Sequence, residues 1–267
     1  MKSILLTGAY GGMGRAAVRA LTCRGFRVFA LDKRIDDGEK EDNVIPVLAD
    51  LTSEEGVRAA FSAVRAECDS LYAILHFAGI YMLDSLVEMS AEAFSRIFEV
   101  NLYAAYLVNK TFLPLLQKGS RIIITTSELA PLDPLPFTGI YAVTKAALDK
   151  YAYSLCMELQ LLGISVSVLR CGAVKTDMLG VSTDELTRFC EKTELYSCNA
   201  KRFRDIVNRV EARHVAPEKI GERVARILDK KRPRFAYCIN RNPLLLLLNA
   251  LPKQIQLWAI RLVLRKK

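Results

Sequence analysis

The sequence predicts an α/β fold: a doubly wound parallel sheet with helices on both faces, formed by a single domain. Apolar runs alternate with helix-forming segments, and the runs are continuous, as is typical of parallel strands buried on both faces. The chain has 267 residues, of which 51% are hydrophobic and 25% charged, so it can bury one large core. Right-handed crossovers favour the doubly wound arrangement, in which ligands bind beyond the carboxyl ends of the strands.

Each element follows from its local sequence. The apolar runs predict strands at residues 3–7, 26–32, 43–51, 71–79, 121–127 and 164–171. The segments between and after them predict helices at 15–25, 53–67, 90–117, 138–162 and 217–231. Ser53 and Ser90 precede two of these helices and are expected to cap them, because a serine hydroxyl accepts a hydrogen bond from a free backbone N–H.

Composition excludes several classes of protein. Seven cysteines without a C-x-x-C pair, and only two histidines, indicate neither a disulfide framework nor a zinc site. We therefore expect free thiols, no metal, and a cytoplasmic protein without a signal peptide. The net charge of +9 is concentrated in residues 230–267, which hold ten Lys/Arg and no acid. These cations lie among leucines rather than in a nucleic-acid-binding module, so no nucleic-acid partner is expected.

The glycine-rich stretch "TGAYGGMG", residues 7–14, joins the first strand to the first helix. Glycines allow a tight turn and let backbone N–H groups approach a phosphate, and the start of a helix adds positive charge. A glycine-rich turn without a ligand is the alternative, because such a motif is weak evidence by itself.

Two acids follow the next strands and indicate a dinucleotide. Asp32 lies eighteen residues after Gly14 and can accept hydrogen bonds from both hydroxyls of an adenosine ribose, which favours NAD. Lys33 and Arg34 directly follow it and leave NADP open, because they can accommodate a 2′-phosphate. Asp50 is expected to accept the adenine amino group, with a turn or cap residue as the alternative.

Tyr141 and Lys145 are four residues apart in a helix-forming run and therefore share one helix face. A free phenol has a pKa of about 10, which is high for a base at neutral pH. An ammonium about 5 Å away, at an effective dielectric constant of about 20, stabilises the phenolate by about 3 kcal/mol. We therefore predict that Lys145 lowers the pKa of Tyr141. The alternative is a tyrosine anchor beside a solvated lysine.

Together these motifs resemble the classical short-chain dehydrogenases/reductases. The resemblance covers residues 2–240 and rests on the TGxxxGxG spacing at 7–14, Asp32, "DL" at 50–51, "HFAG" at 76–79, "VNLYAAY" at 100–106, "IITTS" at 123–127, Tyr141-x-x-x-Lys145 and "LRCGAVKTDM" at 169–178. It implies a Rossmann-like fold with a dinucleotide-binding and catalytic domain over residues 1–240. It also implies that the segment of about 178–214 covers the substrate; a solvated helix pair is the alternative.

The resemblance assigns roles to individual residues. Tyr141 would exchange a proton with a substrate alcohol or ketone, Ser127 would hydrogen-bond the substrate oxygen, Lys145 would hold the nicotinamide ribose, and Asn101 would anchor a proton-relay water. The alternative for Asn101 is a solvent-facing helix residue. The positions expected to bind the cofactor are Thr7, Gly8, Gly12, Met13, Gly14, Asp32, Asp50, Leu51, Ala78, Gly79, Tyr141, Lys145, Val174 and Thr176.

Three departures from the family pattern affect this assignment. Ser127 lies fourteen residues before Tyr141, one more than is usual in the family, so the usual spacing would place Glu128 at the catalytic position. His76 replaces an asparagine and is expected to have a hydrogen-bonding role in the fold rather than a catalytic one. Cys171 replaces a proline, which is expected to loosen the loop that meets the nicotinamide carboxamide.

The tail, residues 241–267, combines leucines with basic residues. Its charge-free run of eleven residues, 242–252, is too short to span a bilayer, and Pro252 is expected to divide the tail into two pieces. A cationic apolar helix carrying Trp258 suits a membrane interface, so peripheral membrane attachment through 243–267 is expected. Packing on the body of the protein or on a partner subunit is the alternative. The helices at 90–117 and 138–162 resemble those that pair in family dimers, so a homodimer or homotetramer is expected.

These observations predict an NAD(P)-dependent oxidoreductase that interconverts a secondary alcohol and a ketone. The hydrophobic tail is similar to those of retinol and hydroxysteroid dehydrogenases, which favours an apolar substrate of steroid, retinoid or fatty acyl type. A nucleotide-binding regulator or scaffold at membranes, without turnover, is the alternative.

Overall fold

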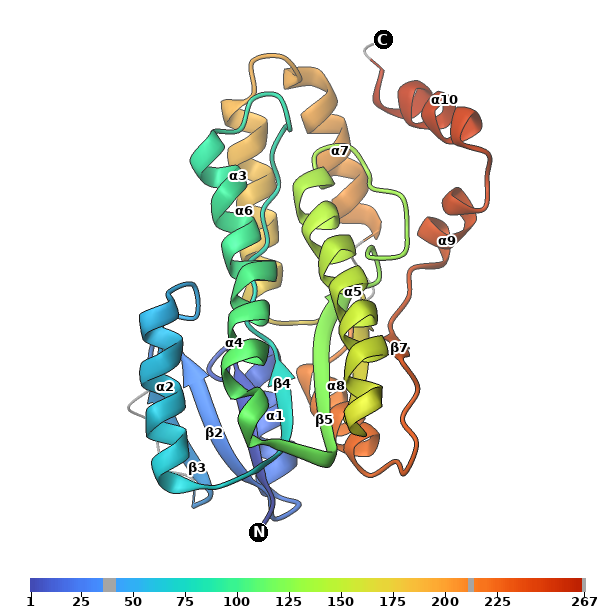
Figure 1. Ribbon diagram of the computed structural model, residues 1–267. Coiled ribbons are helices and arrows are strands. Elements are labelled where there is room, and N and C mark those ends of the chain that lie inside the picture. Colours follow the sequence, from blue (N-terminus) through green and yellow to red (C-terminus); the bar gives the residue numbers. More distant parts are fainter. Residues whose placement is uncertain (36–41, 211–213, 266–267) are drawn as a thin grey trace.

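The computed structural model describes residues 1–35, 42–210 and 214–265 and contains a seven-stranded parallel sheet of order β3-β2-β1-β4-β5-β6-β7 (Figure 1). The strands are β1 (Ser3–Thr7), β2 (Arg27–Asp32), β3 (Val44–Leu48), β4 (Leu71–His76), β5 (Leu116–Ser127), β6 (Ser165–Cys171) and β7 (Ala236–Ile239). The chain reverses its direction of winding between β1 and β4, which are hydrogen-bonded neighbours. The doubly wound, Rossmann-like fold predicted from the sequence is confirmed.

Helices cover both faces of the sheet. They are α1 (Gly12–Thr22), α2 (Glu54–Glu67), α3 (Ala91–Phe98), α4 (Ala104–Phe112), α5 (Gly139–Leu159), α6 (Asp177–Lys192), α7 (Ser197–Val210), α8 (Pro217–Leu228), α9 (Pro243–Asn249) and α10 (Lys253–Leu264). Ser53 and Ser90 cap α2 and α3 as predicted, accepting hydrogen bonds from the backbone N–H of Gly56 and Ala93. The predicted helices 138–162 and 217–231 correspond to α5 with its 3-10 extension and to α8.

Two apolar clusters hold the layers together. One joins a face of the sheet to α1 and α8, and the other joins the opposite face to α2, α4 and α5. Adjacent strand residues divide between them, as Ile4 and Leu6 face one cluster and Leu5 the other. This is why the strands read as continuous apolar runs.

The helix predicted over residues 90–117 is wrong in two respects. A π-helical turn, Glu99–Tyr103, separates α3 from α4, and a 3-10 turn, Leu113–Leu115, ends the helical segment. Pro114 has no N–H to continue a helix, and β5 begins at Leu116, five residues earlier than predicted. The sequence prediction also missed β7, a short, half-buried strand at the sheet edge.

A third cluster lies beyond the carboxyl ends of the strands, where α6 and α7 stand above the sheet (Figure 1). It contains Leu186, Phe189 and Phe203 from these two helices and Leu264 from α10. Residues 178–210 therefore form a helix pair at the predicted place, while 211–213 lie outside the described residues.

The tail turns back onto the body of the protein. Pro252 separates α9 from α10 as predicted, and Asn199 of α7 donates a hydrogen bond from Nδ2 to the Leu264 carbonyl at 2.5 Å. Leu264 is buried, whereas Leu257 and Trp258 face outward. Within the described part of the chain, no helix is long and apolar enough to cross a bilayer.

Candidate active site

The glycine-rich turn lies between β1 and α1 and leaves no room for side chains. Gly8 has a φ of +68°, and a Cβ there would lie 2.5 Å from the backbone nitrogen of Ala78. A Cβ on Gly14 would lie 2.0 Å from the Gly8 carbonyl oxygen. Thr7, fully buried, accepts a hydrogen bond from the Ala78 N–H at its Oγ1 atom, at 3.4 Å. The chain thus forms a bare backbone turn at a helix start, which fits a dinucleotide pyrophosphate.

Asp32 is fastened to this turn. Its Oδ2 atom accepts a hydrogen bond from the Tyr10 N–H at 3.1 Å, which places a carboxylate beside the glycine loop at the end of β2. This position fits an adenosine ribose. Asp50 follows the end of β3 by two residues rather than ending the strand as predicted. It is exposed, and its Oδ1 atom accepts hydrogen bonds from the Thr52 backbone at 2.9 Å and the Thr52 hydroxyl at 2.7 Å, so it has a turn-forming role.

Thr176, another predicted cofactor residue, lies against the same turn. A Cβ on Gly12 would lie 2.7 Å from the Thr176 side chain, so these two residues are in close contact. Val174 and Leu51 are buried, and Met13 packs against the core on the α1 side of the sheet.

Asn101 is buried inside the molecule, at 1% exposure, in the π-helical turn. Its Oδ1 atom accepts a hydrogen bond from the Ile80 N–H at 2.8 Å. Its Nδ2 atom donates to the Ile80 carbonyl at 3.0 Å and to the Thr144 hydroxyl at 3.1 Å. The alternative of a solvent-facing helix residue is therefore wrong. The π-helical turn is a local departure of the kind often found at functional sites.

Lys145 and Asn101 meet beside Gly79. A Cβ on Gly79 would lie 3.2 Å from Asn101 Oδ1 and 3.3 Å from Lys145 Nζ. Lys145 is buried on α5, so the alternative of a solvated lysine is wrong. The backbone of "HFAG" thus has both polar groups next to it at the carboxyl end of β4.

Tyr141 completes the group. Lys145 Nζ lies 5.7 Å from the centroid of the Tyr141 ring, and the Ser127 side chain is close enough to Tyr141 to lower the pKa of its hydroxyl. The ring of Tyr81 packs against Tyr141 with centroids 4.8 Å apart. The fold therefore brings together the predicted set of Asn101, Ser127, Tyr141 and Lys145, while their catalytic roles stay predictions.

The charge state of the pair differs from the sequence prediction. Burial raises the pKa of Tyr141 above its usual range, Tyr81 adds to the rise, and the neighbouring Ser127 side chain opposes it. Burial lowers the pKa of Lys145 to about 8. The predicted lowering of the Tyr141 pKa by Lys145 is not found, because burial is the largest cause of the Tyr141 shift and Lys145 is not among its causes.

Ser127, rather than Glu128, faces the tyrosine. Glu128 Oε2 accepts a hydrogen bond from the Asn242 N–H at 2.6 Å, so this carboxylate lies at the start of the tail. Burial raises the pKa of Glu128. The additional residue between Ser127 and Tyr141 is therefore accommodated in the loop before α5.

Burial keeps His76 and Cys171, two departures from the family pattern, uncharged. His76 Nε2 and Asn109 Oδ1 lie 2.9 Å apart, and Asn109 Nδ2 donates to the Tyr151 hydroxyl at 3.1 Å. Burial lowers the pKa of His76 to about 4, so the imidazole is neutral and joins β4 to α4 and α5, as expected for a role in the fold. Burial raises the pKa of Cys171 to about 12, which keeps it a thiol.

The loop after Cys171 is held in place, contrary to the expected loosening. Gly172 N–H donates to the Ile239 carbonyl at 2.9 Å, and Asn240 Nδ2 donates to the Ala173 carbonyl at 2.8 Å. Lys175 N–H donates to the Val215 carbonyl at 2.9 Å. The missed strand β7 supplies one of these contacts through Ile239, and Asn240, the residue directly after β7, supplies another.

Two contributors were not found from the sequence. Tyr81 contacts Tyr141 from the loop after β4, a position that no motif marked. Asp149 and Arg170 form a bidentate ion pair, with Arg170 Nε and Nη2 donating to Asp149 at 2.9 and 2.7 Å. This pair joins α5, one turn after Lys145, to β6. The one sequence signal for this pair was that Asp149 is an acid four residues after Lys145, on the helix face that carries Tyr141 and Lys145.

Comparison with known proteins gives the family. The sequence profile of the short chain dehydrogenases matches residues 2–187, which include the glycine turn and all four clustered polar residues. The chain belongs to this family of NAD(P)-dependent oxidoreductases.

Relatives of this dehydrogenase differ in substrate. It is 34% identical over 179 residues to the uncharacterized oxidoreductase YbbO of Escherichia coli, covering 66% of each chain. It is 31% identical over 191 residues to estradiol 17-beta-dehydrogenase 2 of Mus musculus, covering 67% of this chain but only 50% of that protein. A 3-ketodihydrosphingosine reductase of Bacteroides thetaiotaomicron is 24% identical and aligns over 97% of this chain and 96% of its own.

Solved structures support the fold. Levodione reductase superposes with a TM-score of 0.76 at 20% identity, covering 90% of this chain and 96% of that one. A short chain dehydrogenase family protein from Francisella tularensis gives a TM-score of 0.74 at 21% identity, covering 90% of this chain and 97% of that one.

Proposed function

We propose that this short chain dehydrogenase interconverts a secondary alcohol and a ketone on an apolar substrate, with Tyr141 as the general acid/base. The single observation that carries the proposal is a chain of neighbours, in which Asn101 and Lys145 lie beside Gly79, Lys145 lies beside Tyr141, and Tyr141 lies beside Ser127. The position of Ser127 beside Tyr141 supports turnover over the alternative of a nucleotide-binding regulator.

The site's own residues account for the proton chemistry. Ser127 orients the substrate oxygen and the Tyr141 hydroxyl. A tyrosine with a raised pKa holds its proton at neutral pH, so it is prepared to donate that proton to a ketone oxygen. Lys145 stabilises the phenolate that forms, and Asn101 fixes the π-helical turn beside it. When bound, the nicotinamide supplies or accepts the hydride.

The dinucleotide would be held by the backbone of residues 7–14, by Asp32 at the ribose and by Lys145. We propose a preference for NAD, because the Asp32 carboxylate lies beside the turn and would repel a 2′-phosphate.

The apolar substrate class is supported by the third cluster, whose aromatic rings adjoin Tyr81. Relatives named for estradiol, for 3-ketodihydrosphingosine and, in Schizosaccharomyces pombe, for 1-acyldihydroxyacetone phosphate suggest steroid or fatty acyl substrates. A panel of keto-steroids, retinoids and acyl-chain ketones, followed by nicotinamide absorbance with NADH and NADPH separately, tests this. Turnover with one class, abolished in Tyr141→Phe, is expected. Turnover restricted to small polar ketones would contradict it.

We also propose peripheral membrane attachment through residues 243–267. The outward face of the tail carries Leu244, Leu247, Leu257, Trp258 and Leu262, all exposed. Co-sedimentation with anionic liposomes, compared between the full chain and one lacking 243–267, is the test. Equal lipid binding by both would refute it.

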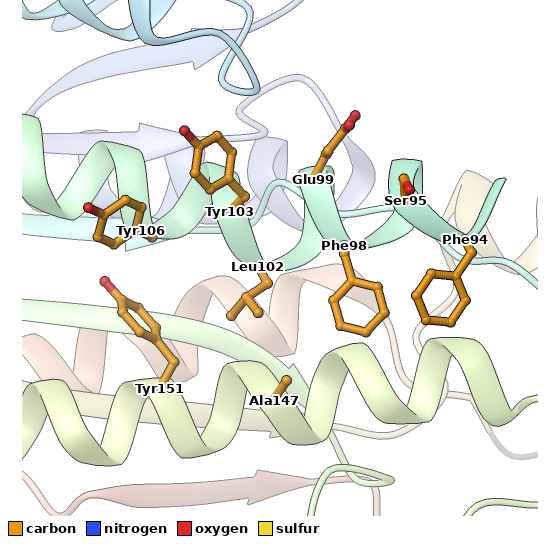
Figure 2. A pocket seen from close by; sticks show the side chains of 9 residues that line it. All are labelled: Phe94, Ser95, Phe98, Glu99, Leu102, Tyr103, Tyr106, Ala147 and Tyr151. Carbon is orange, nitrogen blue, oxygen red and sulfur yellow. The ribbon is translucent and has the colours of Figure 1, made fainter. Parts of the chain in front are cut away.

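A homodimer or homotetramer is supported by an apolar pocket of about 530 Å³ on the outer side of α3, α4 and α5 (Figure 2). Phe98 and Leu102 point from the α3–α4 segment toward Ala147 and Tyr151 of α5. Light scattering of the parent and of Tyr106→Glu, which places a charge at the rim, is the test. A monomeric parent would contradict the proposal.

A further inference from the structure

A second pocket lies between the tail and the body of the protein. We call it the tail groove; it has a volume of about 460 Å³, within the range of small-molecule sites. Its apolar lining includes Leu86 and Val87 from the loop before α3, Phe137 from the loop before α5, and Ile260 and Leu264 from α10. Tyr196 and Asn199 line it from the side of α7.

Two arginines give this groove a positive end. Arg261 and Arg265 also line it, and both are exposed. Within the described part of the chain, neither pairs with a carboxylate. The neighbouring acids are engaged elsewhere: Asp84 pairs with Lys192 at 3.2 Å, and Glu88 accepts from the Thr193 hydroxyl at 2.7 Å. An apolar groove with two unpaired guanidinium groups complements an apolar chain that ends in an anion.

The tail groove is next to the proposed active site. A Cβ on Gly139, two residues before Tyr141, would lie 3.2 Å from Leu86 in the groove wall. Phe137, another wall residue, packs against Phe189 with ring centroids 4.6 Å apart. Tyr81 packs against the same cluster and against Tyr141, so contacts through this cluster connect the groove wall with the catalytic tyrosine.

We propose that the tail groove binds a single-chain amphiphile with an anionic end, and that this amphiphile is the substrate class of the Tyr141 site. The second part rests on the proposed function. The chain would lie along Leu86, Ile260 and Leu264, and the anion would be bound by Arg261 and Arg265. The tail would then form one wall of the substrate site, and its two arginines would select substrates with an anionic end.

The test is calorimetric titration of the full-length protein with decyl phosphate, 1-decanol and decyltrimethylammonium, each below its micelle concentration. Decyl phosphate is expected to bind at least about tenfold more tightly than the other two, because only it can form charge-assisted hydrogen bonds with both arginines. The double variant Arg261→Gln/Arg265→Gln is expected to lose this advantage. Lys231→Gln/Arg232→Gln removes the same charge from exposed positions after α8 and should leave binding unchanged.

Equal affinity for the three probes, or an equal loss in both double variants, would overturn the proposal. Binding to vesicles of anionic lipid without binding to monomeric decyl phosphate would also overturn it, since the arginines would then contact only a membrane surface. These titrations measure binding without turnover, and Tyr141→Phe should bind decyl phosphate like the parent. A failure of the proposed oxidoreductase activity is therefore distinguishable from a failure of the proposed binding site. In turnover assays, ketones with an anionic end should show a KM about tenfold below that of neutral analogues, and Arg261→Gln/Arg265→Gln should remove the difference without changing kcat.

Discussion

Ser127 lies beside Tyr141 and lowers the pKa of its hydroxyl, although the two residues are fourteen positions apart in the chain. Ser127 is the last residue of β5, and Tyr141 lies in the first turn of α5. This effect of Ser127 is smaller than the effect of burial, which raises the pKa of the phenol. Substrate oxygen and phenol oxygen can therefore be held by one hydroxyl group.

Ser127→Ala should lower kcat by about 10- to 100-fold, because a hydrogen bond to a group that becomes charged contributes about 1.5–3 kcal/mol. Glu128→Gln is the matched control and should retain kcat, since Glu128 binds the Asn242 backbone rather than the tyrosine. Steady-state measurement of kcat for both variants shows whether Ser127 or Glu128 occupies the catalytic position. A larger loss in Glu128→Gln than in Ser127→Ala would assign the catalytic position to the acid.

The pH dependence of kcat/KM for ketone reduction should follow the protonation state of Lys145. Its ammonium, which favours the developing phenolate, loses its proton as the pH rises through about 8. We therefore expect kcat/KM for ketone reduction to be constant below that pH and to fall above it. Lys145→Arg stays charged throughout, so its lower activity should lack this alkaline decline. An identical decline in both proteins would show that another group titrates.

Asp32→Asn should change cofactor preference. Removing the carboxylate removes its repulsion of a 2′-phosphate while Lys33 and Arg34 remain, so the ratio of kcat/KM with NADH to that with NADPH should fall at least about tenfold. Arg34→Gln should move the ratio in the opposite direction. A ratio that is the same in the parent and in Asp32→Asn would show that this carboxylate does not select the nucleotide.

The Asp149–Arg170 pair should stabilise the placement of α5 on β6. Both side chains are mostly buried, at 11% and 20% exposure, so Asp149→Asn leaves a poorly solvated guanidinium and should cost about 2–4 kcal/mol of unfolding free energy. Denaturant titration measures this. Glu222→Gln, which breaks the exposed pair with Arg226, should cost less than about 1 kcal/mol. Equal losses in the two variants would show that the buried pair contributes no more to the unfolding free energy than the exposed pair does.

Most of the fold was predictable because its signals are local. Continuous apolar runs gave six strands, and Ser53 and Ser90 marked two helix starts. The π-helical turn was not predictable, because Asn101 within it exchanges two hydrogen bonds with the backbone of Ile80, a residue in another loop. The strand β7 was missed because it has four half-buried residues and little pattern.

The residues of the candidate site could be predicted from the sequence, but the direction of the Tyr141 pKa shift could not. Tyr141 and Lys145 could be paired by their helical spacing. The sign of the Tyr141 pKa shift depends on burial and on Tyr81, which the sequence did not place beside it. The docking of the tail on α7 likewise depends on Asn199 and Leu264, which no local pattern connects.

The central claim is that the Tyr141 hydroxyl transfers the substrate proton. The most direct measurement is the single-turnover rate of ketone reduction by Tyr141→Phe, with NADH binding measured on the same protein. We expect the rate to fall by about 10²- to 10⁴-fold with unchanged NADH affinity, because only the proton donor is lost. A Tyr141→Phe enzyme that reduces the ketone at the parent rate would contradict the account.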